Sequence, residues 1–397
     1  MIFSKLPTFF SLALLLQICF CPIASAFVFQ GSIPQSSNNR SESLRFMSIS
    51  DEARGLLYQD QQEAMLRRSL EEQEILAPQT SLLQAPKLKA ETQRGTGFAA
   101  SQKSSRGARL AAQQAKIMAN EGVLLVENAL SPDMADKLRE YVLQQQQLAL
   151  DATKKDPSKA RSFYGVEQAR ANRCDLQLSL LRGGFNADDE AAEADAADSH
   201  ILADALQEIL GEDGSLRDLY EKLVTLQGEF YELAAVVTHP GSHRQIIHPD
   251  LPFQKIAPLY VVFVALQDVT AEMGPTSFLL KTHTASQNEK FTSGDTSVKN
   301  AQLAASDCRL SCLSKGDAVV FDARILHCGN ANENEDKARA LFNFSFRNPK
   351  VEGSLGYEGS IRPGYFKAMS LVDIGDALEN YKKGDNDPFS KYGSGLV

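Results

Sequence analysis

The sequence contains few cysteines for its length, and they are widely scattered. Six occur in 397 residues, and two of them, Cys19 and Cys21, fall in an N-terminal segment that we expect to be removed. The other four are Cys174, Cys308, Cys312 and Cys328. So few thiols, so far apart, exclude a small disulfide-stapled scaffold. Because Cys308 and Cys312 lack further ligands at zinc-site spacing, we expect buried thiols there.

An excess of positive charge is also missing. The formal net charge is −9, whereas a protein that binds phosphate backbones needs a basic face, so nucleic acid is excluded as the main partner. Part of the negative charge comes from an acidic, alanine-rich run at residues 188–198, which we interpret as a solvated insertion. After the N-terminal segment, no stretch is apolar and long enough to cross a bilayer.

The motifs of several common enzyme classes are absent. The sequence has no glycine-rich phosphate loop before a lysine, no H-E-x-x-H zinc motif and no G-x-S-x-G nucleophile elbow. The sequence therefore contains no motif that indicates one of these enzyme classes.

The N-terminus has the composition of a targeting sequence. Residues 1–26 combine a lysine, an apolar stretch and small residues at the end, which is typical of a secretory signal peptide. Residues 27–50 are rich in Ser and Asn with almost no acid, as in a transit peptide. Together, with Phe27 at the junction, they resemble the bipartite presequences of algal plastids. We expect a plastid location by the secretory route, with secretion or the endomembrane lumen as the alternative.

The remaining sequence divides into an arm, a folded domain and a tail. Residues 51–104 begin with a helical composition and continue as a mostly flexible arm. We place the domain at 105–350 and a loosely packed tail at 351–397. Within the domain, helices are expected at 108–120, at 132–147 after the N-cap Ser131, and at 200–226 with a break at 211–214.

Short β-branched and aromatic runs follow these helices. We expect strands at 123–126, 230–237, 244–248, 259–266, 276–280, 308–313, 318–321 and 340–346. Many short strands after leading helices indicate a mainly β fold, an antiparallel sandwich or barrel with helices packed outside.

The sequence His248-Pro249-Asp250, followed much later by His327, is the main candidate site. Residues two apart on a strand point to the same side, so His248 and Asp250 can converge on one ion. A turn and a bend before His327 can deliver it from another strand. Two imidazoles and one carboxylate can hold Fe(II) on one face and leave positions open for a co-substrate and O2.

Arg339 lies at the start of the last predicted strand. If the alternating residues Phe342, Phe344 and Phe346 face the packed outer layer, Arg339 faces the interior. A guanidinium there could clamp the carboxylate of a co-substrate through paired hydrogen bonds. Taken together, these positions predict an iron- and 2-oxoglutarate-dependent oxygenase.

Three blocks of sequence resemble the phytanoyl-CoA dioxygenase family. They are Pro240-Gly241-Ser242-His243-Arg244-Gln245-Ile246-Ile247-His248-Pro249-Asp250, then Gly274-Pro275-Thr276-Ser277-Phe278-Leu279-Leu280-Lys281-Thr282-His283, and Gly316-Asp317-Ala318-Val319-Val320-Phe321-Asp322 through His327-Cys328-Gly329 with Asn332 and Arg339. The resemblance extends over about residues 122–347.

This resemblance implies a double-stranded β-helix (jelly-roll, cupin-like) core with flanking helices. It implies Fe(II) bound by His248, Asp250 and His327, and 2-oxoglutarate bound by Arg339, with Gln245 and Thr276 as secondary cofactor-binding candidates. O2 is the second co-substrate. Because Asp250 supplies the carboxylate that related halogenating enzymes lack, hydroxylation of a small molecule is favoured over halogenation. A lipid-derived or secondary-metabolite substrate fits, whereas these residues do not support acyl-CoA specifically.

This chain departs from the family pattern at two places. Leu280-Lys281-Thr282-His283 stands where Pro-Gly-Ser-His is common, and Cys328 stands where Arg or Gly is common and is expected to alter the co-substrate wall.

Several interpretations stay open. His239 and His243 could compete as ligands, although a supporting or solvated position is favoured for both. Arg173 and Asp175 could line the entrance or form a structural ion pair. At the level of function, the alternatives are a cupin-like metal-dependent isomerase or hydrolase, and a non-catalytic binding protein with a vestigial site.

Overall fold

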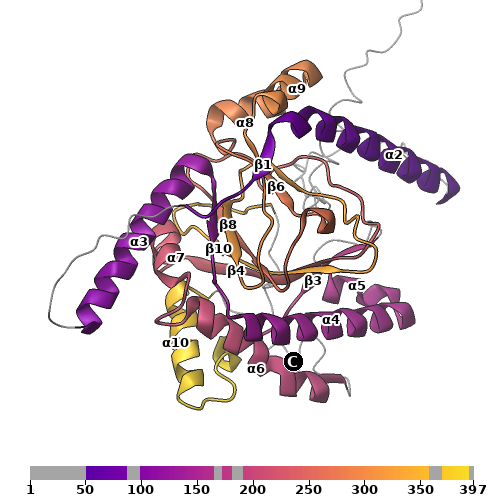
Figure 1. Cartoon of the computed structure of the whole chain (residues 1–397). Coiled ribbons are helices and arrows are strands. Elements are labelled where there is room, and N and C mark those ends of the chain that lie inside the picture. Colours follow the sequence, from indigo (N-terminus) through magenta and orange to yellow (C-terminus); the bar gives the residue numbers. More distant parts are fainter. Residues whose placement is uncertain (1–50, 87–98, 165–171, 181–190, 357–368, 393–397) are drawn as a thin grey trace, which may run out of the picture.

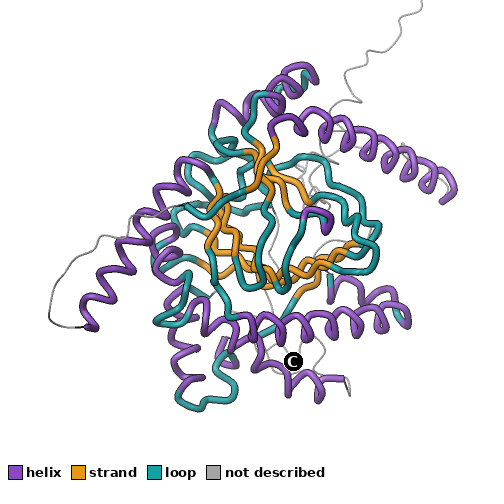
Figure 2. Tube along the Cα trace, viewed as in Figure 1, coloured by secondary structure: helices purple, strands orange, loops and turns teal. Residues whose placement is uncertain are grey.

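A large and a small β-sheet share a buried apolar cluster at the centre of the molecule, and helices surround them (Figures 1 and 2). The computed structural model describes residues 51–86, 99–164, 172–180, 191–356 and 369–392. The predicted signal peptide at 1–26 and transit-like segment at 27–50 lie outside these residues. The predicted fold class is confirmed to the extent that β-sheets with flanking helices are present.

The large sheet is antiparallel throughout. Its order is β2 (Val123–Val126), β8 (Ala318–Asp322), β5 (Leu259–Ala265), β10 (Arg339–Arg347), β4 (Glu229–Thr238) and β3 (Arg173–Gln177). The small sheet has the order β1 (Thr80–Leu82), β7 (Cys308–Leu310), β6 (Thr276–Leu279) and β9 (His327–Gly329). Its first pair, β1 with β7, is parallel, so this sheet is mixed.

The two faces of the large sheet belong to different apolar clusters. On β10, Phe342, Phe344 and Phe346 are fully buried in the cluster that the outer helices share. Leu341, the residue before Phe342, points to the opposite face of the sheet. It belongs to the cluster that contains Phe278 of the small sheet. Because side chains alternate along a strand, Arg339 lies on the face between the sheets, as predicted.

Helices cover the outer face of the large sheet (Figure 1). Buried residues of α4 (Pro132–Lys155), α6 (Ala191–Leu210), α7 (Arg217–Val224) and α10 (Leu371–Lys382) belong to its cluster, and α3 (Ala99–Glu121) contributes Met118. The short α5 (Ala160–Phe163) follows α4. On the other side, α8 (Ala285–Thr292) and α9 (Thr296–Ala304) pack together near α2 (Asp51–Leu76). Short 3₁₀ helices occupy Ala77–Gln79, Pro157–Lys159, Ala271–Met273 and Ser390–Tyr392.

The predicted helix boundaries are partly confirmed. Helix α4 starts as expected, with Ser131 accepting a hydrogen bond from the backbone N–H of Met134 and Pro132 in the first turn. It continues past the predicted end at residue 147 to Lys155, where Asp156 and Pro157 stop it. The predicted break at 211–214 separates α6 from α7. Helix α6 begins earlier than expected, at Ala191, within the acidic run.

Two predicted strands are wrong in part. The segment at 244–248 forms only an isolated bridge, between His248 and His327. It has no continuous strand partner, because its backbone N–H groups bond alternately to β9 and to a side chain of α2. The strand predicted at 308–313 ends at Leu310, and Leu313 makes a separate bridge to Val269.

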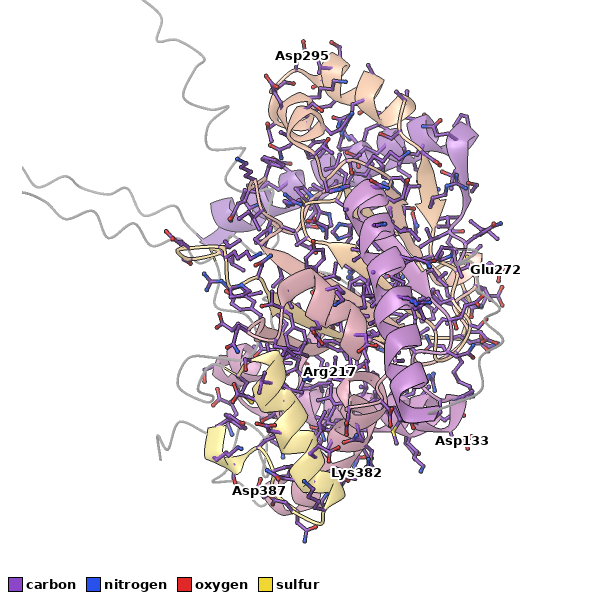
Figure 3. All side chains as sticks on the ribbon, turned by 90° about the vertical axis from the view of Figure 1, so that its left-hand side faces the viewer. Asp133, Arg217, Glu272, Asp295, Lys382 and Asp387 are labelled. Carbon is purple, nitrogen blue, oxygen red and sulfur yellow. The ribbon has the colours of Figure 1, made fainter. Side chains whose placement is uncertain are left out.

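The prediction of a loosely packed tail at 351–397 does not hold for residues 369–392, the part of it beyond Gly356 that the structure describes. Helix α10 begins with a capping box in which Ser370 and Asp373 exchange side-chain-to-backbone hydrogen bonds. Its apolar residues Leu371, Ile374, Ala377 and Leu378 are fully buried. Arg217 of α7 donates a hydrogen bond of 2.6 Å to the carbonyl oxygen of Leu371, and Figure 3 shows it beside this helix. The spacing of these apolar residues, three to four apart, was a helix signal in the sequence.

The packing of α10 can be tested by truncating Leu378. We expect Leu378→Ala to lower the free energy of unfolding by about 2–5 kcal/mol, since it removes a fully buried side chain. In a domain of this size that corresponds to roughly 5 °C or more in Tm. The exposed Lys382→Ala on the same helix is the control and should change stability by less than about 0.5 kcal/mol. Equal melting of the two variants would contradict this packing.

Candidate metal centre

His248, Asp250 and His327 converge between the sheets, as the sequence predicted. One potential ligand atom from each lies within 4.8 Å of the others. Nε2 of His327 is 3.4 Å from Oδ1 of Asp250, and Nε2 of His248 is 3.9 Å from the same oxygen. Both histidines are buried, and the carboxylate is half-buried. The arrangement matches a two-histidine, one-carboxylate site for a divalent metal.

The backbone fixes the distance between the two histidines. The N–H of His248 donates to the carbonyl oxygen of His327 at 3.0 Å, and the N–H of His327 donates back at 2.9 Å. The bend before His327 is closed by a hydrogen bond from Ile325 N to Asp322 O, as expected from the sequence. On the other strand, Leu251 N donates to Ala323 O and anchors the residue after Asp250. The imidazole centroids are consequently 4.7 Å apart.

Each imidazole is oriented by the backbone two residues before it. Nδ1 of His248 lies 2.8 Å from Ile246 O, and Nδ1 of His327 lies 3.0 Å from Ile325 O. A carbonyl oxygen can only accept, so both Nδ1 atoms carry the proton in these bonds. In the neutral rings Nε2 is therefore the nitrogen that carries the lone pair, and both Nε2 atoms lie within 3.9 Å of Asp250 Oδ1. This is the orientation that a metal ligand requires.

Charge pairing accompanies this geometry. Burial acts to raise the pKa of Asp250, but the attraction of His327 and His248 outweighs it and lowers the pKa below its usual value. Burial acts to lower the pKa of His327, but Asp250 outweighs it and raises this pKa. The carboxylate thus stays ionised and available to a cation.

Aromatic rings enclose the site on the side of His327. Phe278 of β6 stacks on His327 with centroids 5.8 Å apart, and Phe321 of β8 lies 5.1 Å from the same ring. Both phenylalanines are fully buried. Apolar walls of this kind exclude water from one side of a metal centre and restrict the motion of the ligand.

Arg339 is the largest fully buried side chain of the described residues. Its Nη2 donates to Thr238 Oγ1 at 3.1 Å, whereas Nε and Nη1 have no hydrogen-bond partner in the part of the chain that the structure describes. Burial, aided by repulsion from Arg173, lowers the pKa of Arg339 to about 9, and Asp175 opposes the shift. The group is still cationic at neutral pH, so the interior holds a charge with two donors that lack an acceptor among the described residues.

Arg173 is a site residue whose position the sequence left open. On three adjacent strands, Arg173, Thr238 and Arg339 are register partners and therefore share one row on the inner face. A Cβ atom at Gly329 would collide with Nη1 of Arg173, so the guanidinium lies directly against β9. Its charge acts on both Asp250 and Arg339. Arg173 is thus close enough to act on both the candidate ligand Asp250 and Arg339.

The two secondary candidates lie beside the same strand, β9. Gln245 Oε1 accepts a hydrogen bond of 2.9 Å from Gly329 N, so this oxygen already holds the loop before His248 against β9. Thr276 is buried and pairs in register with Gly329. It lies two residues from Phe278 and therefore on the same face of β6.

The competing histidines lie elsewhere. His239 Nε2 is within hydrogen-bond distance of the Gln146 side chain, and His243 is exposed. His283 Nε2 lies 3.1 Å from Ala119 O, outside the cluster of ligands. The expectation that Cys328 alters the co-substrate wall is wrong, since the strand alternation that turns His327 inward turns Cys328 outward, into a cluster with Leu326.

Distant similarities to solved structures accompany this geometry. The non-heme alpha-ketoglutarate-dependent epimerase SnoN from nogalamycin biosynthesis is 16% identical, with a TM-score of 0.40 over 62% of this chain and 92% of that chain. HygX from Streptomyces hygroscopicus, solved with nickel and 2-oxoglutarate, is 12% identical, with a TM-score of 0.39 over 60% of this chain and 87% of that chain. Similarities at this level do not bear on the reaction.

The family comparison is specific. No curated protein matches the sequence. The model of the phytanoyl-CoA dioxygenase (PhyH) family matches residues 118–340, which is more than half of the chain and contains His248, Asp250, His327 and Arg339. The chain therefore belongs to the phytanoyl-CoA dioxygenase family.

Proposed function

We propose that the protein is an Fe(II)- and 2-oxoglutarate-dependent oxygenase that hydroxylates a small molecule. The observation that carries this proposal is the buried Arg339, whose Nε and Nη1 lack partners in the described chain. It lies on the inner face in register with Arg173, whose charge also acts on the candidate ligand Asp250. A buried guanidinium in that condition is costly unless an anion completes it. A dicarboxylate that also reaches the metal meets this need.

Membership of the family confirms the predicted cofactors, which are Fe(II), 2-oxoglutarate and O2. The donor set fits them, because two imidazole nitrogens and one carboxylate suit ferrous iron and leave coordination positions open. When bound, the iron supplies oxidation by O2 coupled to decarboxylation of 2-oxoglutarate, which yields succinate.

The protein contributes orientation, charge and exclusion of water. His248 and His327 would hold the metal through Nε2, and Asp250 would balance part of its charge. Arg339 would bind the far carboxylate of 2-oxoglutarate through a charge-assisted pair of hydrogen bonds. Phe278 and Phe321 keep water away from the side of His327. We also propose that the core has the connectivity of a double-stranded β-helix, in which case the site lies between its two sheets.

The substrate class belongs to the proposal as well. A lipid-derived or secondary-metabolite substrate is consistent with the apolar Phe278 and Phe321 beside a small number of polar groups. Among the helices that the structure describes, none is long and apolar enough to span a membrane. The plastid location stays a prediction, because residues 1–50 lie outside the described part of the chain.

The test uses the metal centre itself. Under anaerobic conditions, the protein with Fe(II) and 2-oxoglutarate should show a weak visible metal-to-ligand charge-transfer band. We expect His248→Ala to abolish this band, because it removes one of two imidazole ligands. His243→Ala, an exposed histidine in the same segment, is the control and should keep the band.

Oxygen consumption then separates the proposed function from its alternatives. Succinate release coupled to O2 uptake, with a product that gains one oxygen in mass, supports an oxygenase. A metal-dependent isomerase or hydrolase would bind the metal without this coupling. A protein that binds neither metal nor 2-oxoglutarate would be a binding protein with a vestigial site, and the proposal would be wrong.

A further inference from the structure

Helix α2, which covers the part of the arm with a predicted helical composition, is joined to the segment that carries His248. Ser69 Oγ donates to the carbonyl oxygen of Arg244 at 3.1 Å, and Arg244 Nη1 donates to the carbonyl oxygen of Ser69 at 2.9 Å. Ser69 is only 1% exposed. These reciprocal bonds fix the C-terminal half of α2 against residues 244–248.

The closest link runs through Glu72. Its Oε2 accepts a hydrogen bond of 2.7 Å from the backbone N–H of Ile247, the residue directly before His248. His248 directs its own N–H and carbonyl toward His327, so the N–H of Ile247 points away from β9. At the edge of a sheet such a donor would be left to water or unpaired. Glu72 therefore takes the place of a neighbouring strand.

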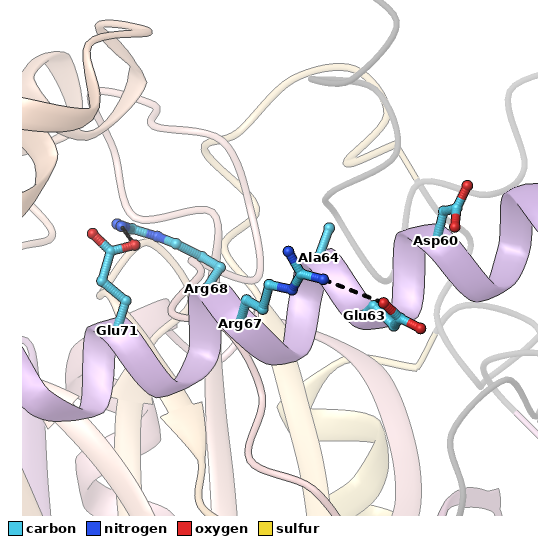
Figure 4. A pocket seen from close by; sticks show the side chains of 6 residues that line it. All are labelled: Asp60, Glu63, Ala64, Arg67, Arg68 and Glu71. Atoms are coloured by element: carbon cyan, nitrogen blue, oxygen red, sulfur yellow. Dashed lines mark hydrogen bonds and ion pairs between the residues drawn. The ribbon is translucent and has the colours of Figure 1, made fainter.

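Two arginines hold this carboxylate in position. Arg68 Nε donates to Glu72 Oε1 at 3.0 Å, and Arg244 Nη1 is 3.7 Å from Oε2. Arg68 also donates to Asn300 of α9 and pairs with Glu71, and Figure 4 shows Arg68 and Glu71 together on this helix. Burial raises the pKa of Glu72 above its ordinary value, and the Ile247 N–H and the two guanidiniums offset only part of this shift. A buried charge with this many partners is rigidly placed.

Apolar contacts reinforce the same junction. Leu76, at the end of α2, belongs to one buried cluster with Ile247, Leu326 and Cys328. These three partners are the residues adjacent to His248 and His327 in the sequence. Since neighbouring residues on a strand face opposite sides, α2 lies behind both metal-binding segments while the imidazoles face the cavity.

We propose that Glu72 is a positioning residue for the metal centre, which it orients through the backbone of Ile247. The inference rests on the proposed function. Glu72 touches neither the ligands nor the cavity. It fixes the peptide that precedes His248 and so limits the directions in which the imidazole can point. Partners that orient metal ligands typically change metal affinity by about 10- to 100-fold when they are removed.

The experiment compares Glu72→Leu with Glu72→Gln, and titrates each protein with Co(II) as a spectroscopic probe. We expect Glu72→Leu to bind Co(II) about 10-fold or more weakly than the wild type. Glu72→Gln keeps an oxygen that can accept from Ile247 and should recover most of the affinity. Hydrogen exchange in the metal-free protein gives a second measure, since Glu72→Leu should speed the exchange of the peptide that contains Ile247.

Glu71→Leu is the matched control. Glu71 is the next residue on α2 and also pairs with Arg68 and Asn300, but none of these contacts is with residues 244–250. Its Co(II) affinity should equal that of the wild type. Should Glu72→Leu not fold, Glu72→Ala takes its place.

The outcomes separate the two proposals. If folded Glu72→Leu binds Co(II) as tightly as the wild type, with unchanged exchange at Ile247, the inference is wrong and the proposed function stands. If the wild type binds no Co(II), the proposed function falls and the inference falls with it.

Discussion

Replacement of Arg339 by methionine is expected to stabilise the metal-free protein and to abolish the binding of 2-oxoglutarate. The guanidinium is fully buried, and Nε and Nη1 have no partner among the described residues, which costs about 1–3 kcal/mol of folding free energy. Methionine fills a similar volume without that cost. The metal-free variant should therefore melt several degrees above the wild type.

The same substitution should remove the main contact of the co-substrate. Loss of one partner from a buried, hydrogen-bonded charge pair costs about 2–5 kcal/mol, which corresponds to roughly 30-fold or more in affinity. Isothermal titration of the protein loaded with Co(II) measures this change. In addition, 2-oxoglutarate should raise the Tm of the wild type and leave that of Arg339→Met unchanged.

Arg347→Met is the matched control, because Arg347 lies on the same strand and the same face. It already has partners, with Glu229 at 3.6 Å and Val351 O at 3.0 Å. We expect this variant to lose stability and to bind 2-oxoglutarate normally. An Arg339→Met protein that is less stable than the wild type, or that binds the co-substrate equally well, would show that Arg339 has a structural role only.

Replacement of Asp250 by asparagine is expected to have the largest effect on the metal. The carboxylate faces Nε2 of both histidines, and an amide of the same shape carries no charge to balance a divalent ion. Co(II) affinity should fall by more than about 100-fold, the upper range for loss of a residue that merely orients a ligand. Turnover of 2-oxoglutarate should become undetectable.

A second measurement on Asp250→Asn needs no metal. Since the attraction of Asp250 is what raises the pKa of His327, removing the charge should lower that pKa, and NMR titration of the metal-free protein follows it directly. Asp175→Asn serves as the control, because this acid lies next to Arg173 on β3 and belongs to no ligand cluster. Retention of tight Co(II) binding by Asp250→Asn would contradict the ligand set.

Local sequence patterns predicted the parts of the site that depend on strand alternation. Arg339 and Phe342 are an odd number of positions apart on one strand. Strand alternation therefore predicted that Phe342 faces the helices and Arg339 faces the interior. Likewise, the bend before His327 follows from local turn chemistry in 322–325. The mutual bonds of His248 and His327 could not be predicted, because they join residues far apart in the sequence.

Local sequence patterns did not predict the parts of the structure that depend on long-range contacts. Residues 244–248 have the composition of a strand, but their edge is completed by Glu72 of α2, a helix whose contact with these residues the sequence did not indicate. Arg173 remained undecided because only the pairing of β3 with β4 brings it level with Thr238 and Arg339. Helix α10, which lies within the predicted tail, was missed for another reason. Its Gly, Lys and Asp content obscured four regularly spaced apolar residues.

The reciprocal peptide bonds between His248 and His327 have a consequence for metal capture. The separation of the two rings is set when the chain folds, so an arriving ion meets donor atoms that already lie within 4.8 Å of one another. Little ordering entropy remains to be lost on binding, which favours tight retention. Because these backbone hydrogen bonds hold the two imidazoles at a set separation, the site cannot contract or widen to suit ions of different radius. The folded backbone therefore determines which metals fit.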